Sequence, residues 1–296
     1  MPDPCARLFL IDGSSYIFRA FFAIPQLASA RGMPTNAIFG FTNMVLKLLR
    51  EHRPDYVMVA LDAGRDTFRH QMFAAYKGHR PEPPADLIPQ LPYFRKILDA
   101  LSVVYLELPG YEADDIIASL CDTMAGKGCD LIVVSNDKDL MQLVTQGTRL
   151  LDGVHNRWIG SDQVQEKFGV PPERVIQVMG LIGDAVDNIP GVRGIGAKTA
   201  MRLIRQFGTL ENLFSRLDEV ETMPLRGAAR VRKILEDSKD AAFLSRALAT
   251  VKRDVPIAIA LNDLRARAPD RETVRALFNE LGFFNLLKLF EANRLG

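Results

Sequence analysis

The sequence has little cysteine, little histidine and no long apolar run, and each scarcity excludes a class of protein. Its three cysteines, Cys5, Cys121 and Cys129, form no Cys-x-x-Cys pair, and only four histidines are scattered along the chain. We therefore expect neither a disulfide framework nor a cysteine-based zinc site. We expect a reduced, cytoplasmic setting. No apolar stretch approaches the roughly 20 residues that cross a bilayer. Asp12 interrupts the short apolar run near the N-terminus, so we expect neither a membrane span nor a signal peptide.

The overall charge is almost balanced, but the balance hides local segregation. The 296 residues carry a formal net charge of +1, with 48% apolar and 25% charged residues, which is an ordinary globular composition. A chain of this length forms one large domain or two modest ones. Acidic and basic residues gather in separate segments, so the net charge alone does not identify the partner.

Three short apolar runs are typical of buried strands, and carboxylates follow each of them. The runs with their carboxylates are residues 8–11 with Asp12, residues 56–61 with Asp62, and residues 131–134 with Asp137 and Asp139. Helical patterns over residues 36–50 and 113–125 lie between or near these runs. The alternation predicts an α/β fold with a mostly parallel sheet covered on both faces. Ligands of such sheets bind beyond the carboxyl ends of the strands, where these acidic residues are expected.

Nine acidic side chains are candidates for one shared site. They are Asp12, Asp62, Glu112, Asp114, Asp115, Asp137, Asp139, Asp184 and Asp187. Like charges brought close together cannot all stay ionised without compensation, and we expect no run of lysine or arginine to adjoin the strand ends. Divalent cations would resolve the conflict, and oxygen-only ligation favours Mg²⁺, with Mn²⁺ as a substitute. Two such ions about 4 Å apart can clamp a phosphodiester and activate a water.

A single aspartate after a strand is more often a turn former or a helix cap than a metal ligand. Four separate acidic clusters, three of them after apolar strands, favour the shared site over that alternative. Glu112 is expected at the edge of a helix that begins near Ala113, from which it can turn inward beside Asp114. Asp115 has an alternative role, which is to order its neighbours.

Residues 63–92 combine basic and aromatic side chains and then become rich in proline. The side chains of interest are Arg69, Tyr76, Lys77 and Arg80. Cations that follow phosphates and rings that stack on bases suit single-stranded nucleic acid. The alternative is an amphipathic helix that buries its aromatic face, and both interpretations can hold together. We expect this segment to be mobile and to lie outside the sheet.

A glycine-rich turn over residues 189–200 leads into a basic helix. Its expected phosphate-binding residues are Arg193, Gly194, Gly196, Lys198 and Thr199. Glycines let backbone N–H groups approach a phosphate, and a helix N-terminus adds a favourable dipole. Such a unit grips a duplex backbone without reading its sequence. A tight helix–helix turn with solvated charges is the alternative, which the basic run and the nearby Asp184 and Asp187 disfavour.

The composition changes near residue 170, where two prolines precede a series of short helical patterns. We therefore expect a catalytic domain at 1–170, a helical DNA-binding subdomain at 171–250 and a return segment at 251–296 that rejoins the first domain. No internal repeat is evident.

Eight strings of the sequence resemble the motifs of a known family. They are FLIDGSS (9–15), VALD (59–62), TFR (67–69), YKGHR (76–80), GYEADD (110–115), DKD (137–139), GDAVDNIPG (183–191) and GIGAKT (194–199). They run in the family's order and cover nearly the whole chain. In these strings the sequence is similar to the 5′-nuclease domain of bacterial DNA polymerase I and to stand-alone 5′–3′ exonucleases and flap endonucleases.

The resemblance implies a PIN-like nuclease fold with a helical arch at about 63–92 and a helix–hairpin–helix-type duplex clamp. It implies one metal ion surrounded by Asp12, Asp62, Glu112 and Asp114, and a second surrounded by Asp137, Asp139, Asp184 and Asp187, partly through water. Lys77 and Arg80 match the arch's basic motif, which would act at the scissile phosphate. The resemblance also implies K⁺ bound by backbone carbonyls of the hairpin. The implied substrates are DNA with 5′ ends, 5′ flaps or RNA primers.

The sequence departs from the family's motifs at two positions, and two other functions are alternatives to this interpretation. Asn136 replaces a glycine that many relatives have before the DKD string, and Ala75 precedes Tyr76 where an aromatic residue is common. A polymerase region is expected in the same chain or in another, and the protein is expected to be a monomer. The alternatives are a module that binds branched DNA without cutting it, which the intact carboxylate set disfavours, and a PIN-type ribonuclease, which the duplex clamp disfavours.

Overall fold

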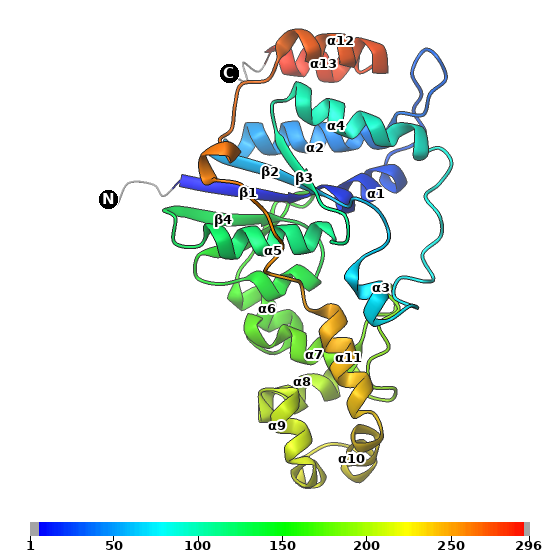
Figure 1. Cartoon of the computed structure of the whole chain (residues 1–296), viewed down its shortest axis with the longest axis vertical. Coiled ribbons are helices and arrows are strands. Elements are labelled where there is room, and N and C mark those ends of the chain that lie inside the picture. Colours follow the sequence, from blue (N-terminus) through cyan, green and yellow to red (C-terminus); the bar gives the residue numbers. More distant parts are fainter. Residues whose placement is uncertain (1–5, 293–296) are drawn as a thin grey trace.

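A six-stranded sheet forms the centre of the protein, and its strands lie in the order β3-β2-β1-β4-β5-β6 (Figure 1). The computed structural model describes residues 6–292, so Cys5 and the end of the return segment lie outside the described residues. The strands are β1 (Ala6–Asp12), β2 (Tyr56–Leu61), β3 (Val104–Glu107), β4 (Cys129–Val134), β5 (Thr148–Asp152) and β6 (Arg157–Ile159). All neighbouring strands are parallel except β5 and β6. The predicted mostly parallel sheet is confirmed, and the three predicted strands correspond to β1, β2 and β4.

Alternate side chains of β1 enter two hydrophobic clusters on opposite faces of the sheet. Leu8 and Leu10 belong to the cluster that contains the apolar face of α5 (Ala113–Met124). Phe9 and Ile11 belong to the other cluster. All four side chains are fully buried. Because both faces are covered, the inner strands are nearly continuous apolar runs, and this is why the sequence pattern located them.

The helices lie on both faces of the sheet and in a separate helical region. The face opposite α5 packs against α1 (Gly13–Ala23), α2 (Asn36–His52), α4 (Leu91–Ala100), α12 (Arg271–Leu281) and α13 (Phe284–Ala292). The two predicted helices correspond to α2 and α5. The short 3₁₀ helices are η1 (Ile88–Gln90), η2 (Asp139–Leu143), η3 (Pro172–Arg174), η4 (Leu217–Thr222) and η5 (Leu261–Leu264).

A helical region extends from one side of the sheet (Figure 1). Its helices are α6 (Ser161–Phe168), α7 (Val175–Ile182), α8 (Ala197–Phe207), α9 (Leu210–Ser215), α10 (Ala228–Asp237) and α11 (Lys239–Ala249). Leu203 of α8 lies in the same hydrophobic cluster as the buried face of α5, so the core is continuous with that of the sheet. After α11 the chain returns to the sheet, where the Ala266 N–H donates to the Asp55 carbonyl at 2.9 Å.

The segment 63–92 is mostly non-helical, which corrects the expectation of a helical arch. It contains the five-residue α3 (Phe68–Met72) and η1, with turns and extended chain between them. Pro81, Pro83 and Pro84 lie in the non-helical part. Each proline lacks an N–H donor and disfavours a helical residue before it, which accounts for the interruption.

None of the helices among residues 6–292 combines the length and the apolar character needed to cross a bilayer.

Candidate active site

The carboxyl ends of β1 and β4 are joined through Asp12. Its Oδ1 accepts a hydrogen bond from the Ser15 N–H at 3.0 Å, which caps α1, and its Oδ2 accepts one from the Ser135 hydroxyl at 2.7 Å. The same hydroxyl accepts from the Asp137 N–H at 3.0 Å. One serine therefore positions two carboxylates, one at the end of β1 and one in the turn after β4.

The next two acidic residues meet at the start of α5. Asp62 follows β2, and its Oδ1 accepts a hydrogen bond from the Ala113 N–H at 2.8 Å. Glu112 is the N-cap residue of this helix, as the sequence predicted. The positive end of the helix dipole favours negative charge at this position. Asp62, Glu112 and Asp114 thus share one end of α5.

Asp137 and Asp139 occupy the turn after β4. The Asp139 N–H donates to Asp137 Oδ1 at 2.8 Å, which fixes the turn. Asp139 Oδ1 is buried and has no hydrogen-bond partner among the described residues. A buried acceptor without a donor is unfavourable, and such an atom is suited to a ligand.

The crowding predicted from the sequence is visible in the proton affinities of these groups. Burial, followed by repulsion from neighbouring carboxylates, raises the pKa of Asp12 to about 7 and the pKa of Asp139 to about 8. The pKa of Asp114 is well above its ordinary value, first because of burial and then because of Asp12, Asp137 and Glu112. The strand ends therefore hold several carboxylates that resist ionisation together.

Three cations from separate segments adjoin the site: Lys77 and Arg80, which were expected near the scissile phosphate, and Lys138, which was not expected there. Lys77 Nζ lies 2.7 Å from Glu112 Oε1 and 3.7 Å from Asp187 Oδ2. Arg80 pairs with Asp187, and Lys138 pairs with Asp184. Burial would raise the pKa of Asp184, but the hydrogen bonds from Lys138 and from the Val186 N–H outweigh it, and that pKa lies below its ordinary value. The sequence missed these pairs because they join different segments of the chain.

The turn that carries Lys77 is docked on the loop that carries Asp187. The Lys77 N–H donates to the Asp187 carbonyl at 2.9 Å, and the Asn188 side chain donates to the Ala75 carbonyl. Lys77 itself has a positive φ of 52°, a conformation that only a minority of non-glycine residues adopt. The two predicted catalytic cations, Lys77 and Arg80, are thus brought to the acidic cluster.

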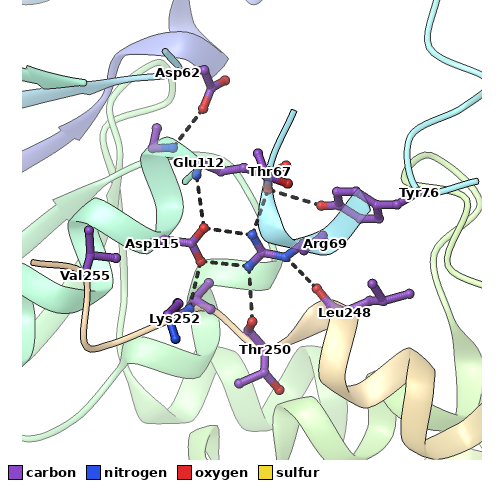
Figure 2. Close-up of polar contacts among 12 residues, drawn as sticks. Asp62, Thr67, Arg69, Tyr76, Glu112, Asp115, Leu248, Thr250, Lys252 and Val255 are labelled. Atoms are coloured by element: carbon purple, nitrogen blue, oxygen red, sulfur yellow. Dashed lines mark hydrogen bonds and ion pairs between the residues drawn. The ribbon is translucent and has the colours of Figure 1, made fainter. Parts of the chain in front are cut away.

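Three predicted site residues have other positions than expected. Arg69 and Tyr76 were expected to contact DNA, yet each is only 2% exposed. Asp115 was expected either near a metal or as a residue that orders its neighbours, and the structure favours the second role. Its side chain is fully buried and forms a bidentate ion pair with Arg69, with both distances at 2.8 Å (Figure 2). All three residues therefore belong to the protein interior in this conformation.

No three acidic, histidine or cysteine side chains among residues 6–292 are placed to share one metal ion. Glu112, Asp184 and Asp187 are instead paired with Lys77, Lys138 and Arg80. The chemistry of the group still fits a hard divalent cation, because the donors are carboxylates and Asp139 Oδ1 lacks a partner. Binding of such an ion would require the lysine and arginine side chains to move.

The glycine-rich turn forms an exposed surface between α7 and α8. Arg193, Gly194, Gly196 and Lys198 are exposed, and Thr199 is half-buried. Ile195, between the glycines, is buried and anchors the turn in the core. Gly196 caps α8, so the helix N-terminus opens onto this surface. Backbone N–H groups and cations are therefore presented together, as an anion-binding turn requires.

Two family models cover most of the chain. The 5′–3′ exonuclease N-terminal resolvase-like domain matches residues 7–169, and the 5′–3′ exonuclease C-terminal SAM fold matches residues 170–272. The chain belongs to the 5′–3′ exonuclease family. The resemblance noted from the eight strings is thereby confirmed.

Curated relatives of the exonuclease family include both long and short proteins. A 5′–3′ exonuclease of Aquifex aeolicus is 36% identical over 281 residues, which cover 95% of this chain and 94% of that protein. DNA polymerase I of Bacillus caldotenax is 42% identical over 292 residues, 97% of this chain, but only 32% of the polymerase is covered. The chain therefore spans about a third of the length of the polymerases that it matches.

Solved structures of similar fold come from two nucleases. A zinc-bound T5 5′-exonuclease superposes with a TM-score of 0.67 at 21% identity, over 93% of this chain and 99% of that chain. The catalytic core of Rad2 in complex with DNA gives a TM-score of 0.62 at 18% identity, over 94% of this chain and 89% of that chain. The fold is PIN-like, as predicted.

The raised pKa of Asp139 predicts a pH-dependent gain of stability on neutralising it. The folded protein holds this proton more tightly than the unfolded chain, so stability from this group is full below its unfolded pKa and is lost as the pH rises through about 8. In chelator-treated protein, the free energy of unfolding of Asp139→Asn should exceed that of the wild type by about 1–3 kcal/mol at about pH 9 and by much less at about pH 4.

Asp184→Asn is the matched control, because its effect on the free energy of unfolding should have the opposite sign. The pKa of Asp184 is lowered, so its stabilising effect is present above its unfolded pKa and is lost on acidification. This substitution should destabilise the protein at neutral pH. Denaturant titration at several pH values measures both effects, and a gain for Asp139→Asn that does not change with pH would contradict the assignment.

Proposed function

We propose that this protein hydrolyses phosphodiester bonds of DNA at 5′ ends and 5′ flaps, and of RNA primers paired to DNA, in a reaction that depends on divalent cations. The observation that carries the proposal is the group of buried carboxylates at the carboxyl edge of the sheet, with Lys77 and Arg80 beside them. Zinc-bound T5 5′-exonuclease and the DNA complex of Rad2 support it, because both have this fold.

Two groups of carboxylates would hold the ions. Asp12, Asp62, Glu112 and Asp114 would hold one, and Asp137, Asp139, Asp184 and Asp187 the other. When bound, Mg²⁺ or Mn²⁺ would activate the attacking water and stabilise the charge on the leaving oxygen. Asp115 is not included, since Arg69 occupies its carboxylate.

Lys77 and Arg80 would exchange partners during the reaction. In the free protein they neutralise Glu112 and Asp187. If these carboxylates held divalent cations, the lysine and arginine side chains would become available to the scissile phosphate. Oriented positive charge at this phosphate lowers the barrier, since negative charge develops there in the transition state.

The duplex is held by the turn between α7 and α8. Its exposed Arg193 and Lys198 and its backbone N–H groups would contact phosphates, which gives affinity without sequence selectivity. Carbonyl groups of the same turn would bind K⁺. We assign residues 1–170 to catalysis, 171–250 to DNA binding and 251–296 to the return segment. The protein would act as a cytoplasmic monomer, with a polymerase region in the same or another chain.

Cleavage of a 5′-flap DNA in Mg²⁺ tests the proposal. Asp137→Asn should reduce the single-turnover rate by about 100-fold or more, because losing one negative ligand removes several kcal/mol of transition-state stabilisation. Asp162→Asn, at an exposed position of α6, should cleave like the wild type. Equal rates for the three proteins would refute the acidic site, and cleavage of RNA alone would support the ribonuclease instead.

Salt dependence of binding tests the clamp. Lys198→Ala should weaken binding to all duplex sequences alike and reduce the slope of log affinity against log salt by about one. Lys96→Ala, on the exposed side of α4, should change neither. Measurements in Ca²⁺ at several salt concentrations give both slopes. An unchanged slope together with a changed sequence preference would contradict the clamp.

A further inference from the structure

A buried ion pair between Arg69 and Asp115 lies beside the acidic site and has no part in the chemistry proposed so far. Arg69 belongs to α3 and Asp115 to the first turn of α5. Their side chains are 3% and 0% exposed. Removing two charges from water is costly unless every donor and acceptor finds a partner.

Every polar atom of the pair is satisfied, as Figure 2 shows. The five N–H groups of the guanidinium donate to both oxygens of Asp115, to Glu112 Oε2 and to the carbonyls of Leu248 and Thr250. The Asp115 carboxylate also accepts from the Glu112 N–H at 3.0 Å and the Lys252 N–H at 2.8 Å. Neither side chain has capacity left for a metal ion or for DNA.

The pair controls Glu112 from two directions. Asp115 holds the backbone N–H of Glu112, while Arg69 at 3.3 Å and the Tyr76 hydroxyl at 3.1 Å hold its Oε2. Oε1 is left to face Lys77, at the site. One oxygen of Glu112 is therefore fixed by the interior, and the other is directed to where a cation is expected.

The same guanidinium also fixes the end of the helical region. Leu248 lies in the last turn of α11, and Thr250 is the first residue after this helix. The hydrogen bonds from Arg69 to their carbonyls join α11 to α3 and α5. The distance between the duplex-binding turn and the acidic site thus depends in part on this pair.

We propose that Arg69 and Asp115 are positioning residues. They orient Glu112 for cation binding and fix its position relative to α11. The inference rests on the proposed function, because it assigns Glu112 to a divalent cation. Residues that hydrogen-bond a metal ligand in this way tune the affinity of the site, although they touch neither metal nor substrate.

A second ion pair offers a matched control. Arg253 and Asp122 also join the segment after α11 to α5, at 2.8 Å, but their side chains are 41% and 47% exposed and lie away from Glu112 in the hydrogen-bond network. Arginine-to-lysine substitution keeps the charge in both pairs and removes the planar fork. If the Arg69–Asp115 pair only linked these segments, the arginine-to-lysine substitution would have the same effect on Mg²⁺ binding in either pair.

Isothermal titration of the DNA-free protein with MgCl₂ tests the inference. Arg69→Lys should weaken Mg²⁺ binding by about 10-fold or more. Arg253→Lys should stay within about twofold of the wild type, as exposed pairs contribute little. Duplex affinity, measured in Ca²⁺ at saturating concentration, should be unchanged in both. Wild-type Mg²⁺ affinity in Arg69→Lys would overturn the inference, whereas a wild type that binds no Mg²⁺ would overturn the proposed function instead.

Because Arg69→Lys could fail to fold, the wild-type protein provides a second measurement. In a crystal soaked with Mn²⁺, the anomalous signal should lie next to Glu112, with the Arg69–Asp115 hydrogen bonds kept. An Mn²⁺ ion bound directly to Asp115 would overturn the assignment.

Discussion

Electrostatic repulsion among the carboxylates at the carboxyl edge of the sheet is the constraint on which the rest of the site depends. The parallel order of β1, β2 and β4 brings Asp12, Asp62 and Asp137 to one edge by topology alone. The apolar strands and helices around them exclude water, which raises the pKa of Asp12 to about 7. Each further feature of the site either compensates this charge or fixes the groups that carry it.

Compensation comes from cations that lie outside the sheet. Lys77 and Arg80 belong to the segment 63–92 and reach Glu112 and Asp187, so the docking of this segment depends on the charge of the site. A divalent cation would compete with these side chains for the same oxygens. The exchange would free the cations only when the site is loaded, which couples metal binding to phosphate binding. The buried Arg69–Asp115 pair is the fixed support beside this exchange.

Sequence patterns located the parts of the fold in which apolar residues form a clear run or repeat, or in which neighbouring residues mark the start of a helix. The strands β1, β2 and β4 were found because both of their faces are buried, whereas β3 is only partly buried along its length and β6 has three residues, so neither gives a clear pattern. Glu112 was placed correctly because the helix was expected to begin near Ala113, which puts Glu112 at its edge. The interior hydrogen bonds of Arg69 were missed because its partners lie 46 and 179 residues away in the chain, and no local pattern reports such distances.

If divalent cations relieve the crowding of these carboxylates, they should stabilise the metal-free protein against unfolding. The free energy of unfolding is measured by denaturant titration in MgCl₂ and in NaCl of equal ionic strength. A ligand at 100 times its Kd stabilises by about 2.7 kcal/mol for each site, so MgCl₂ should stabilise the protein far more than NaCl, which only screens charge. Equal stabilisation by the two salts would show that divalent cations do not bind these carboxylates specifically.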